Sequence, residues 1–237
     1  MSGDSATADD QPGVRDSILA IPRPGLIFFS VFIALAYVAI AWWGWSGRNF
    51  FDDPARLALF IAFVALGALT PACGCNLNPG RTGRRGNDWI FLPLLGAGLL
   101  MGWAAARDDR MNVWTLGLPA IRYFGLIVFL LGSALRIGSI LTLGDRFSVW
   151  VAIQHGHRVQ TTGLYRWMLH PSYTGAILTL FGWALVFRSG AGVLLVLMMI
   201  PPLVLRMNAE EQLLVAEFGE EYSRYRDRTA RLIPGIY

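Results

Sequence analysis

Long apolar segments alternate with short polar stretches along the chain. Six such segments follow a polar N-terminal stretch, at residues 25–45, 54–70, 89–106, 119–143, 171–187 and 190–207. Several of them approach the roughly 20 residues with which a helix spans a bilayer. The pattern therefore predicts an all-α fold, a polytopic integral membrane bundle of about six transmembrane helices.

Local signals indicate where two of these helices begin and how the last two are connected. Proline stands in the first turn of the second and fifth segments, at Pro54 and Pro171, where its missing N–H is harmless. Arg188-Ser189-Gly190 is a short turn, so we expect the fifth and sixth helices to form an antiparallel hairpin. Pro201-Pro202 is expected to kink the sixth helix.

Composition supports the membrane assignment and excludes soluble enzymes. Of the 237 residues, 54% are hydrophobic and 15% are charged, against about 25% charged in an ordinary soluble domain. All 20 basic residues are arginine, which is typical of a strongly GC-biased genome and favours a bacterial inner-membrane protein. No basic run is interleaved with aromatic residues, so we expect no nucleic-acid partner.

The segments suggest a single domain with three parts. Residues 1–24 form a polar tail that lacks the features of a signal peptide. Residues 25–143 hold the first four helices, and residues 144–237 form a catalytic region of a loop, a helical hairpin and a C-terminal helix. Cys73 and Cys75 are too close in sequence for an unstrained disulfide and have no histidine near them, so we interpret them as loop residues and expect no metal.

Arginines in the short loops predict the orientation of the protein. They gather between the second and third segments and between the fourth and fifth segments (Arg81, Arg84, Arg85, Arg146, Arg158 and Arg166). The loop at 107–110 is neutral and Arg188 is alone. The positive-inside rule then places both termini and the 144–170 loop in the cytoplasm.

Histidines and glutamates gather on that same cytoplasmic side. The three histidines lie within sixteen residues of one another, and the five glutamates lie within twelve residues after the last apolar segment (His155, His157, His170, Glu210, Glu211, Glu217, Glu220 and Glu221). The two clusters flank the predicted hairpin in sequence. They can therefore meet at its open end and form a site.

The start of the fifth helix is a candidate binding site for an anionic group. Pro171 keeps His170 out of helical conformation, so unpaired N–H groups and the positive end of the helix dipole should face the cytoplasm. The alternative, in which Ser172 and Tyr173 merely cap and anchor the helix, remains open.

The region after Leu203 has the pattern of one amphipathic helix that leaves the membrane. Leu214, Phe218, Tyr222 and Tyr225 fall on one face at spacings of four, four and three residues. Arg206 still belongs to the apolar segment and lies one turn before Glu210. An arginine at that depth needs an acidic partner or a ligand.

These residues resemble the isoprenylcysteine carboxyl methyltransferase family, which forms a wider group with phospholipid N-methyltransferases. The resemblance is carried by Gly163-Leu164-Tyr165-Arg166, His170-Pro171-Ser172-Tyr173-Thr174-Gly175, Arg206-x-x-x-Glu210-Glu211, Leu214, Phe218-Gly219, Tyr222, Tyr225 and Arg231-Leu232-Ile233-Pro234. It covers residues 144–237. Earlier segments match only as membrane helices. The family usually has arginine before the His-Pro pair, where this chain has Leu169.

The resemblance implies transfer of a methyl group from S-adenosylmethionine to a lipophilic or lipidated acceptor that enters from membrane lipid. It also implies a set of cofactor-binding residues (Gln154, His157, Gly163, Tyr165, His170, Pro171, Tyr173, Glu210 and Glu211). By the same resemblance, Arg206, Glu210 and His170 are candidate catalytic residues. No obligatory protein partner is implied.

Three alternative functions remain open at this point. A phospholipid amine or a small thiol is an alternative methyl acceptor. A sterol-type reductase that uses NADPH shares a related C-terminal arrangement, although the chain has no glycine-rich dinucleotide fingerprint. A lipid-binding protein without catalysis is the third.

Overall fold

The computed structural model describes residues 22–77, 82–83, 89–150, 152–153 and 158–236. Its helices are α1 (Arg23–Trp45), α2 (Pro54–Ala72), α3 (Phe91–Met111), α4 (Ile121–Leu143), α5 (Pro171–Val186), α6 (Gly190–Phe218) and α7 (Glu220–Asp227). The connections contain the 3-10 turns η1 (Arg48–Phe50), η3 (Gly144–Arg146) and η4 (Gly163–Arg166) and the two-residue strands β1 (Thr82–Gly83) and β2 (Ala152–Ile153). Each of the six apolar segments forms a helix, so the predicted all-α fold is confirmed.

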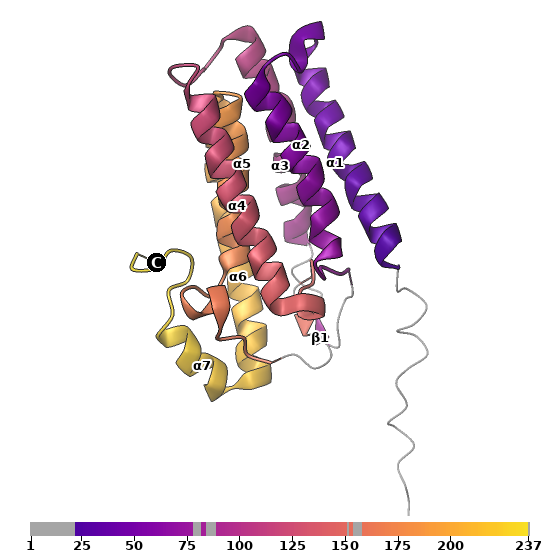
Figure 1. Cartoon of the computed structure of the whole chain (residues 1–237). Helices are drawn as coiled ribbons and strands as arrows, with labels where there is room; N and C mark the ends of the chain where they lie inside the picture. Colours follow the sequence, from indigo (N-terminus) through magenta and orange to yellow (C-terminus); the bar gives the residue numbers. More distant parts are fainter. Residues whose placement is uncertain (1–21, 78–81, 84–88, 151, 154–157, 237) are drawn as a thin grey trace, which may run out of the picture.

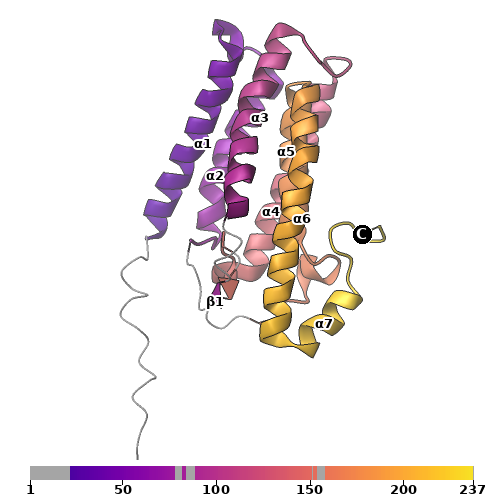
Figure 2. The same ribbon diagram turned by 180° about the vertical axis from the view of Figure 1, so that it is seen from behind.

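The six long helices run alternately up and down, with α1 to α3 on one side of the bundle and α4 to α6 on the other (Figures 1 and 2). Among the described residues, α1, α2, α4 and α6 are long and apolar enough to cross a membrane. The α5 helix is apolar but has only 16 residues. The connections that follow α2 and α4 lie at the same end of the bundle as the start of α1 and as α7 (Figure 1).

Glycines let α4 and α5 pack backbone to backbone. A Cβ atom at Gly132 would lie 2.6 Å from the Thr179 nitrogen, and one at Gly182 would lie 2.4 Å from the Phe129 nitrogen. Gly125 and Gly175 are equally crowded by the opposite helix. Small residues allow such close approach between membrane helices, where van der Waals contact replaces the hydrophobic driving force. We call these four glycines the glycine seam.

A buried ionic cluster ties the opposite end of the bundle together. The Asp109 carboxylate accepts hydrogen bonds from Arg56 at 3.2 Å, from Arg122 at 2.7 and 2.8 Å, and from Arg188 at 2.9 and 3.1 Å. The expectation that residues 107–110 form a neutral loop and that Arg188 is alone was wrong. The α3 helix extends to Met111 because Asp109 turns inward toward these arginines, which come from three other parts of the chain.

Two predictions for the C-terminal region need correction. The α6 helix continues past Met207 to Phe218, so no boundary separates its apolar part from its polar part. The single amphipathic helix is in fact two helices, because Gly219 adopts a positive φ of 56° and turns the chain into α7. The apolar face is nevertheless continuous, since Tyr222 and Tyr225 of α7 pack in one cluster with Leu214 and Phe218 of α6.

Candidate active site

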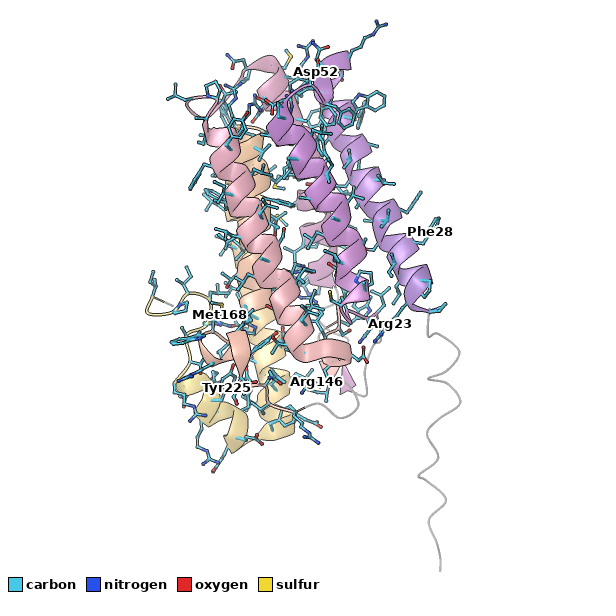
Figure 3. All side chains as sticks on the ribbon, in the orientation of Figure 1. Arg23, Phe28, Asp52, Arg146, Met168 and Tyr225 are labelled. Carbon is cyan, nitrogen blue, oxygen red and sulfur yellow. The ribbon has the colours of Figure 1, made fainter. Side chains whose placement is uncertain are left out.

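A cavity of about 360 Å³ lies at the end of the bundle where α4, α5, α6 and α7 meet. That volume falls within the roughly 300–1,000 Å³ range of small-molecule sites. Arg146 and Tyr225, labelled in Figure 3 at this end of the molecule, are among the residues that line it. The lining is polar toward η4 and α7 and becomes apolar toward the helices, where Leu94 of α3 and Leu203 of α6 contribute.

Two charged groups of opposite sign are joined in the cavity through one tyrosine. The Arg206 Nε donates a hydrogen bond to the Tyr173 hydroxyl at 2.9 Å, and this hydroxyl donates to Glu210 Oε2 at 3.0 Å. Arg206 also donates to the Val149 carbonyl. The sequence led us to expect either an acidic partner or a ligand at Arg206. Among the described residues it reaches the Glu210 carboxylate only through Tyr173.

The neighbouring carboxylate, Glu211, has a different position. Its Oε1 lies 2.9 Å from His170 Nε2 and accepts a hydrogen bond from Arg231 Nε at 2.8 Å. His170 lines the cavity, whereas Glu211 lies behind it and does not. Arg231 donates to Asn208 Oδ1 as well. Glu211 therefore fixes the His170 ring and ties the C-terminal segment to α6.

The structure corrects the expectation of free N–H groups at the start of α5. The His170 N–H donates to the Arg231 carbonyl at 3.1 Å, and the Tyr173 N–H donates to the His170 carbonyl at 3.1 Å. Pro171 has no N–H, which leaves only Ser172 of the four groups that a helix N-terminus exposes. Any anionic group in the cavity must therefore rely on the arginine side chains that line it.

Three tyrosines form the aromatic part of the cavity. Tyr165, Tyr222 and Tyr225 line it from η4 and α7, and the Tyr225 hydroxyl donates to the Tyr165 carbonyl at 2.5 Å. Burial raises the pKa of Tyr225 to about 12. Burial, together with the nearby Glu210 carboxylate, raises the pKa of Tyr165 as well. These hydroxyls stay neutral at physiological pH and can donate hydrogen bonds.

The structure brings together most of the residues that the sequence singled out. His170, Tyr165, Tyr173, Arg206 and Glu210 line the cavity. Three other candidates lie beside it without being among its lining residues (Glu211, Gly163 and Pro171). Gly163 adopts a positive φ of 63° at the start of η4, and Pro171 is buried in the first turn of α5. The candidates Gln154 and His157 lie outside the described residues.

Two arginines in the cavity were missed by sequence reasoning. Arg136 lines it from α4, and its NH1 donates to the Ser172 hydroxyl at 3.3 Å. Arg146 lines it from η3 and donates to Gln160 Oε1 at 3.1 Å. Arg136 lies in the fourth apolar segment, which we treated only as a membrane helix. A lone arginine within such a segment is the signal that would have found it.

A comparison with known proteins supports the resemblance seen in the sequence. Residues 125–216 match the model of the isoprenylcysteine carboxyl methyltransferase (ICMT) family. This range runs from α4 to α6 and contains the Arg206–Tyr173–Glu210 chain. The predicted resemblance is confirmed over this range, which begins earlier than we expected and ends before α7.

Curated relatives and a solved structure show similarity of the same kind. The chain is 33% identical over 134 residues to protein-S-isoprenylcysteine O-methyltransferase from Tribolium castaneum, a match that covers 51% of this chain and 45% of the relative. It is 31% identical over 115 residues to the Homo sapiens enzyme of that name, covering 47% and 40%. The chain thus spans about half the length of these relatives. The structure of the eukaryotic intramembrane Ras methyltransferase ICMT aligns with a TM-score of 0.46 at 20% identity, covering 89% of this chain and 84% of that one.

Proposed function

We propose that the chain is an S-adenosylmethionine-dependent methyltransferase of the membrane and that it methylates the carboxyl group of an isoprenylcysteine-like acceptor. One observation carries the proposal. The segment that matches the family model holds a cavity in which a carboxylate and a guanidinium meet through Tyr173, and the apolar lining of that cavity continues between the helices.

The donor set of the cavity fits this cofactor. When bound, S-adenosylmethionine supplies a methyl group activated by a positively charged sulfur. The Glu210 carboxylate attracts such a cation, and the faces of Tyr165, Tyr222 and Tyr225 contribute further through cation–π contact. Tyrosine hydroxyls and the Gln160 amide supply hydrogen bonds for the polar remainder of the cofactor.

Positioning and exclusion of water are the main contributions of the protein. A terminal carboxyl group has a pKa of about 3.5, so it is ionised at neutral pH and needs no general base. The chain has to hold this group in line with the methyl group in a site from which water is excluded. Arg206 lies at the junction between the polar and apolar parts of the cavity, where it can hold the acceptor. Glu210 and Tyr173 orient Arg206.

The other candidate residues support this arrangement. His170, fixed by Glu211, forms part of the cavity wall next to Tyr173, since the two rings lie 5.4 Å apart edge to face. Gly163 and Pro171 shape the backbone on either side of Tyr165 and at the start of α5. Gln154 and His157 remain candidates for cofactor contacts through the family resemblance alone.

We also propose that the cavity end of the bundle faces the cytoplasm of a bacterial inner membrane. This proposal is supported by the positive-inside rule, since both arginine-rich loops follow helices that end at that side. It also gives the site access to a cofactor that is made in the cytoplasm.

Binding measurements on detergent-purified protein test the proposed function. We expect S-adenosylmethionine to bind and NADPH not to bind in isothermal titration calorimetry. A lipid extract incubated with methyl-labelled cofactor should then yield a labelled, base-labile methyl ester. Binding of NADPH alone would favour the reductase, a base-stable labelled product would favour an amine or thiol acceptor, and binding of neither cofactor would favour a lipid-binding protein.

A further inference from the structure

Arg136 occupies an unusual place in the cavity. It lies on α4 two helical turns before that helix ends at Leu143, within a segment whose composition suits a membrane span. Its backbone is held against α5, because a Cβ atom at Gly175 would lie 2.8 Å from the Arg136 nitrogen. The arginine is therefore fixed by the glycine seam next to the start of α5, and its side chain lines the cavity.

The guanidinium of Arg136 has no counter-charge among the residues that the structure describes. Its hydrogen bond is to the neutral hydroxyl of Ser172, itself a buried residue. By contrast, Arg56, Arg122 and Arg188 at the other end of the bundle all pair with Asp109. Arginines within membrane segments are costly and generally pair with an anion or face a functional cavity. Arg136 does the latter.

A second guanidinium adds to this positive charge. Arg206 lies on the same cavity, close enough for its charge to interact with that of Arg136, and both groups are near the Tyr173 hydroxyl. Arg206 in turn forms hydrogen bonds to a hydroxyl and a carbonyl, and no described carboxylate pairs with it directly. Two cations thus face one space without an acid between them. This arrangement is stable only when an anion shares that space or water screens the two charges.

We propose that Arg136 binds the carboxylate of the acceptor together with Arg206 and that it selects carboxylate acceptors over amines. The inference rests on the proposed methyltransferase function and deepens it by assigning a specificity residue to the acceptor class. A carboxylate between two guanidinium groups gains charge-assisted hydrogen bonds from both. A protonated amine at the same place meets two like charges, which disfavours its binding.

The position of Arg136 also suits an acceptor with a lipid tail. From this point the lining continues along Leu94, Ala176 and Leu203 toward the interior of the bundle. An acceptor whose carboxylate lies at Arg136 can place its apolar chain along these residues. Glu210, on the far side of Tyr173, is left for the cationic part of the cofactor.

A pair of ligands that differ only in charge tests the proposal. The ligands are an N-acetylated S-prenylcysteine acid and its carboxamide, titrated into purified protein with S-adenosylhomocysteine present to prevent turnover. We expect the acid to bind more tightly than the amide. In Arg136→Gln, we expect the dissociation constant of the acid to rise roughly 10- to 100-fold and that of the amide to change less than about 3-fold. Arg136→Lys should restore part of the preference for the acid, because it keeps the charge.

Controls separate this proposal from a folding defect and from the proposed function. Arg107→Gln removes a positive charge from the exposed surface of α3 near the other end of the bundle and should change neither ligand. S-adenosylhomocysteine should bind Arg136→Gln as tightly as the wild type, which shows that the variant is folded. An acid affinity that is unchanged in Arg136→Gln, or acid and amide affinities that fall equally, would overturn the role of Arg136. A wild-type protein that binds the acid through Arg136 but forms no methyl ester would instead overturn the proposed reaction.

Discussion

Glutamine at position 210 or at position 211 should produce two different defects, although the two glutamates are neighbours on one helix. Glu210 faces the cavity and accepts a hydrogen bond from Tyr173. Glu211 lies behind His170 and contacts both that ring and Arg231. We therefore expect Glu210→Gln to weaken cofactor binding at nearly unchanged stability. Glu211→Gln should lower stability first.

The magnitudes follow from the contacts that each carboxylate makes. Glu211 is 13% exposed and Arg231 is 18% exposed, so their ion pair is screened little by water. Glutamine keeps the shape but loses the charge in both of its contacts, at about 1–2 kcal/mol each. The loss of about 2–4 kcal/mol corresponds to a fall in Tm of roughly 5–15 °C for a chain of this size. Glu210→Gln keeps an acceptor for the Tyr173 hydroxyl, so the expected loss of stability is below about 1 kcal/mol.

Thermal unfolding in detergent and calorimetric titration of S-adenosylmethionine measure the two effects on the same preparations. For Glu210→Gln we expect the cofactor dissociation constant to rise roughly 10- to 100-fold, the loss of one charge-assisted contact. For Glu211→Gln below its Tm, the rise should stay under about 5-fold. Glu220→Gln, at an exposed position of α7, is the matched control and should change neither property. If Glu210→Gln and Glu211→Gln gave the same Tm and the same cofactor affinity, the assignment of separate roles would be refuted.

Three further predictions concern the rest of the molecule. Asp109→Asn should lower the free energy of unfolding by about 3–5 kcal/mol, because it leaves three buried arginines without their counter-charge, while cofactor affinity of the folded protein stays unchanged; equal Tm values would contradict this. With a carboxylate acceptor, kcat should be nearly flat between about pH 6 and 8, and a steep acid limb would instead indicate an amine or thiol that must lose a proton. In a background in which Cys73 and Cys75 are replaced by serine, a cysteine at Arg110 should react with an impermeant thiol reagent from outside the cell and one at Arg84 should not; the reverse pattern would invert the proposed orientation.

Local signals predicted the helices well because they act over a few residues. Proline in the first turn marked the start of α2 and of α5, and both helices begin at that proline. The break at Gly219 was missed because the apolar face continues across it. The periodicity of Leu214, Phe218, Tyr222 and Tyr225 is satisfied equally by one long helix and by two helices that fold onto the same cluster.

The site was predicted in its residues but only partly in its contacts. Spacing on one helix could suggest that Arg206 and Glu210 lie close together. It could not show that Tyr173, 33 residues from Arg206, would stand between them. Glu210 and Glu211 are indistinguishable in sequence, because their different roles depend on partners 37 and 41 residues away on another helix. Arg188 looked isolated for the same reason, since its partner Asp109 is 79 residues distant in sequence.

The glycine seam determines which wall of the cavity can move. Along α4 and α5 the two backbones touch without intervening side chains, and parting them would expose polar backbone and lose contacts along the whole length of the interface. These two helices therefore act as a rigid wall that carries Arg136, Ser172 and Tyr173 as one unit. A lipid that diffuses sideways out of the bilayer must be admitted on the opposite side, where α3 contributes Leu94 and Leu95 to the lining. Opening and closing then leave the carboxylate-binding geometry undisturbed while the passage for the tail changes its width.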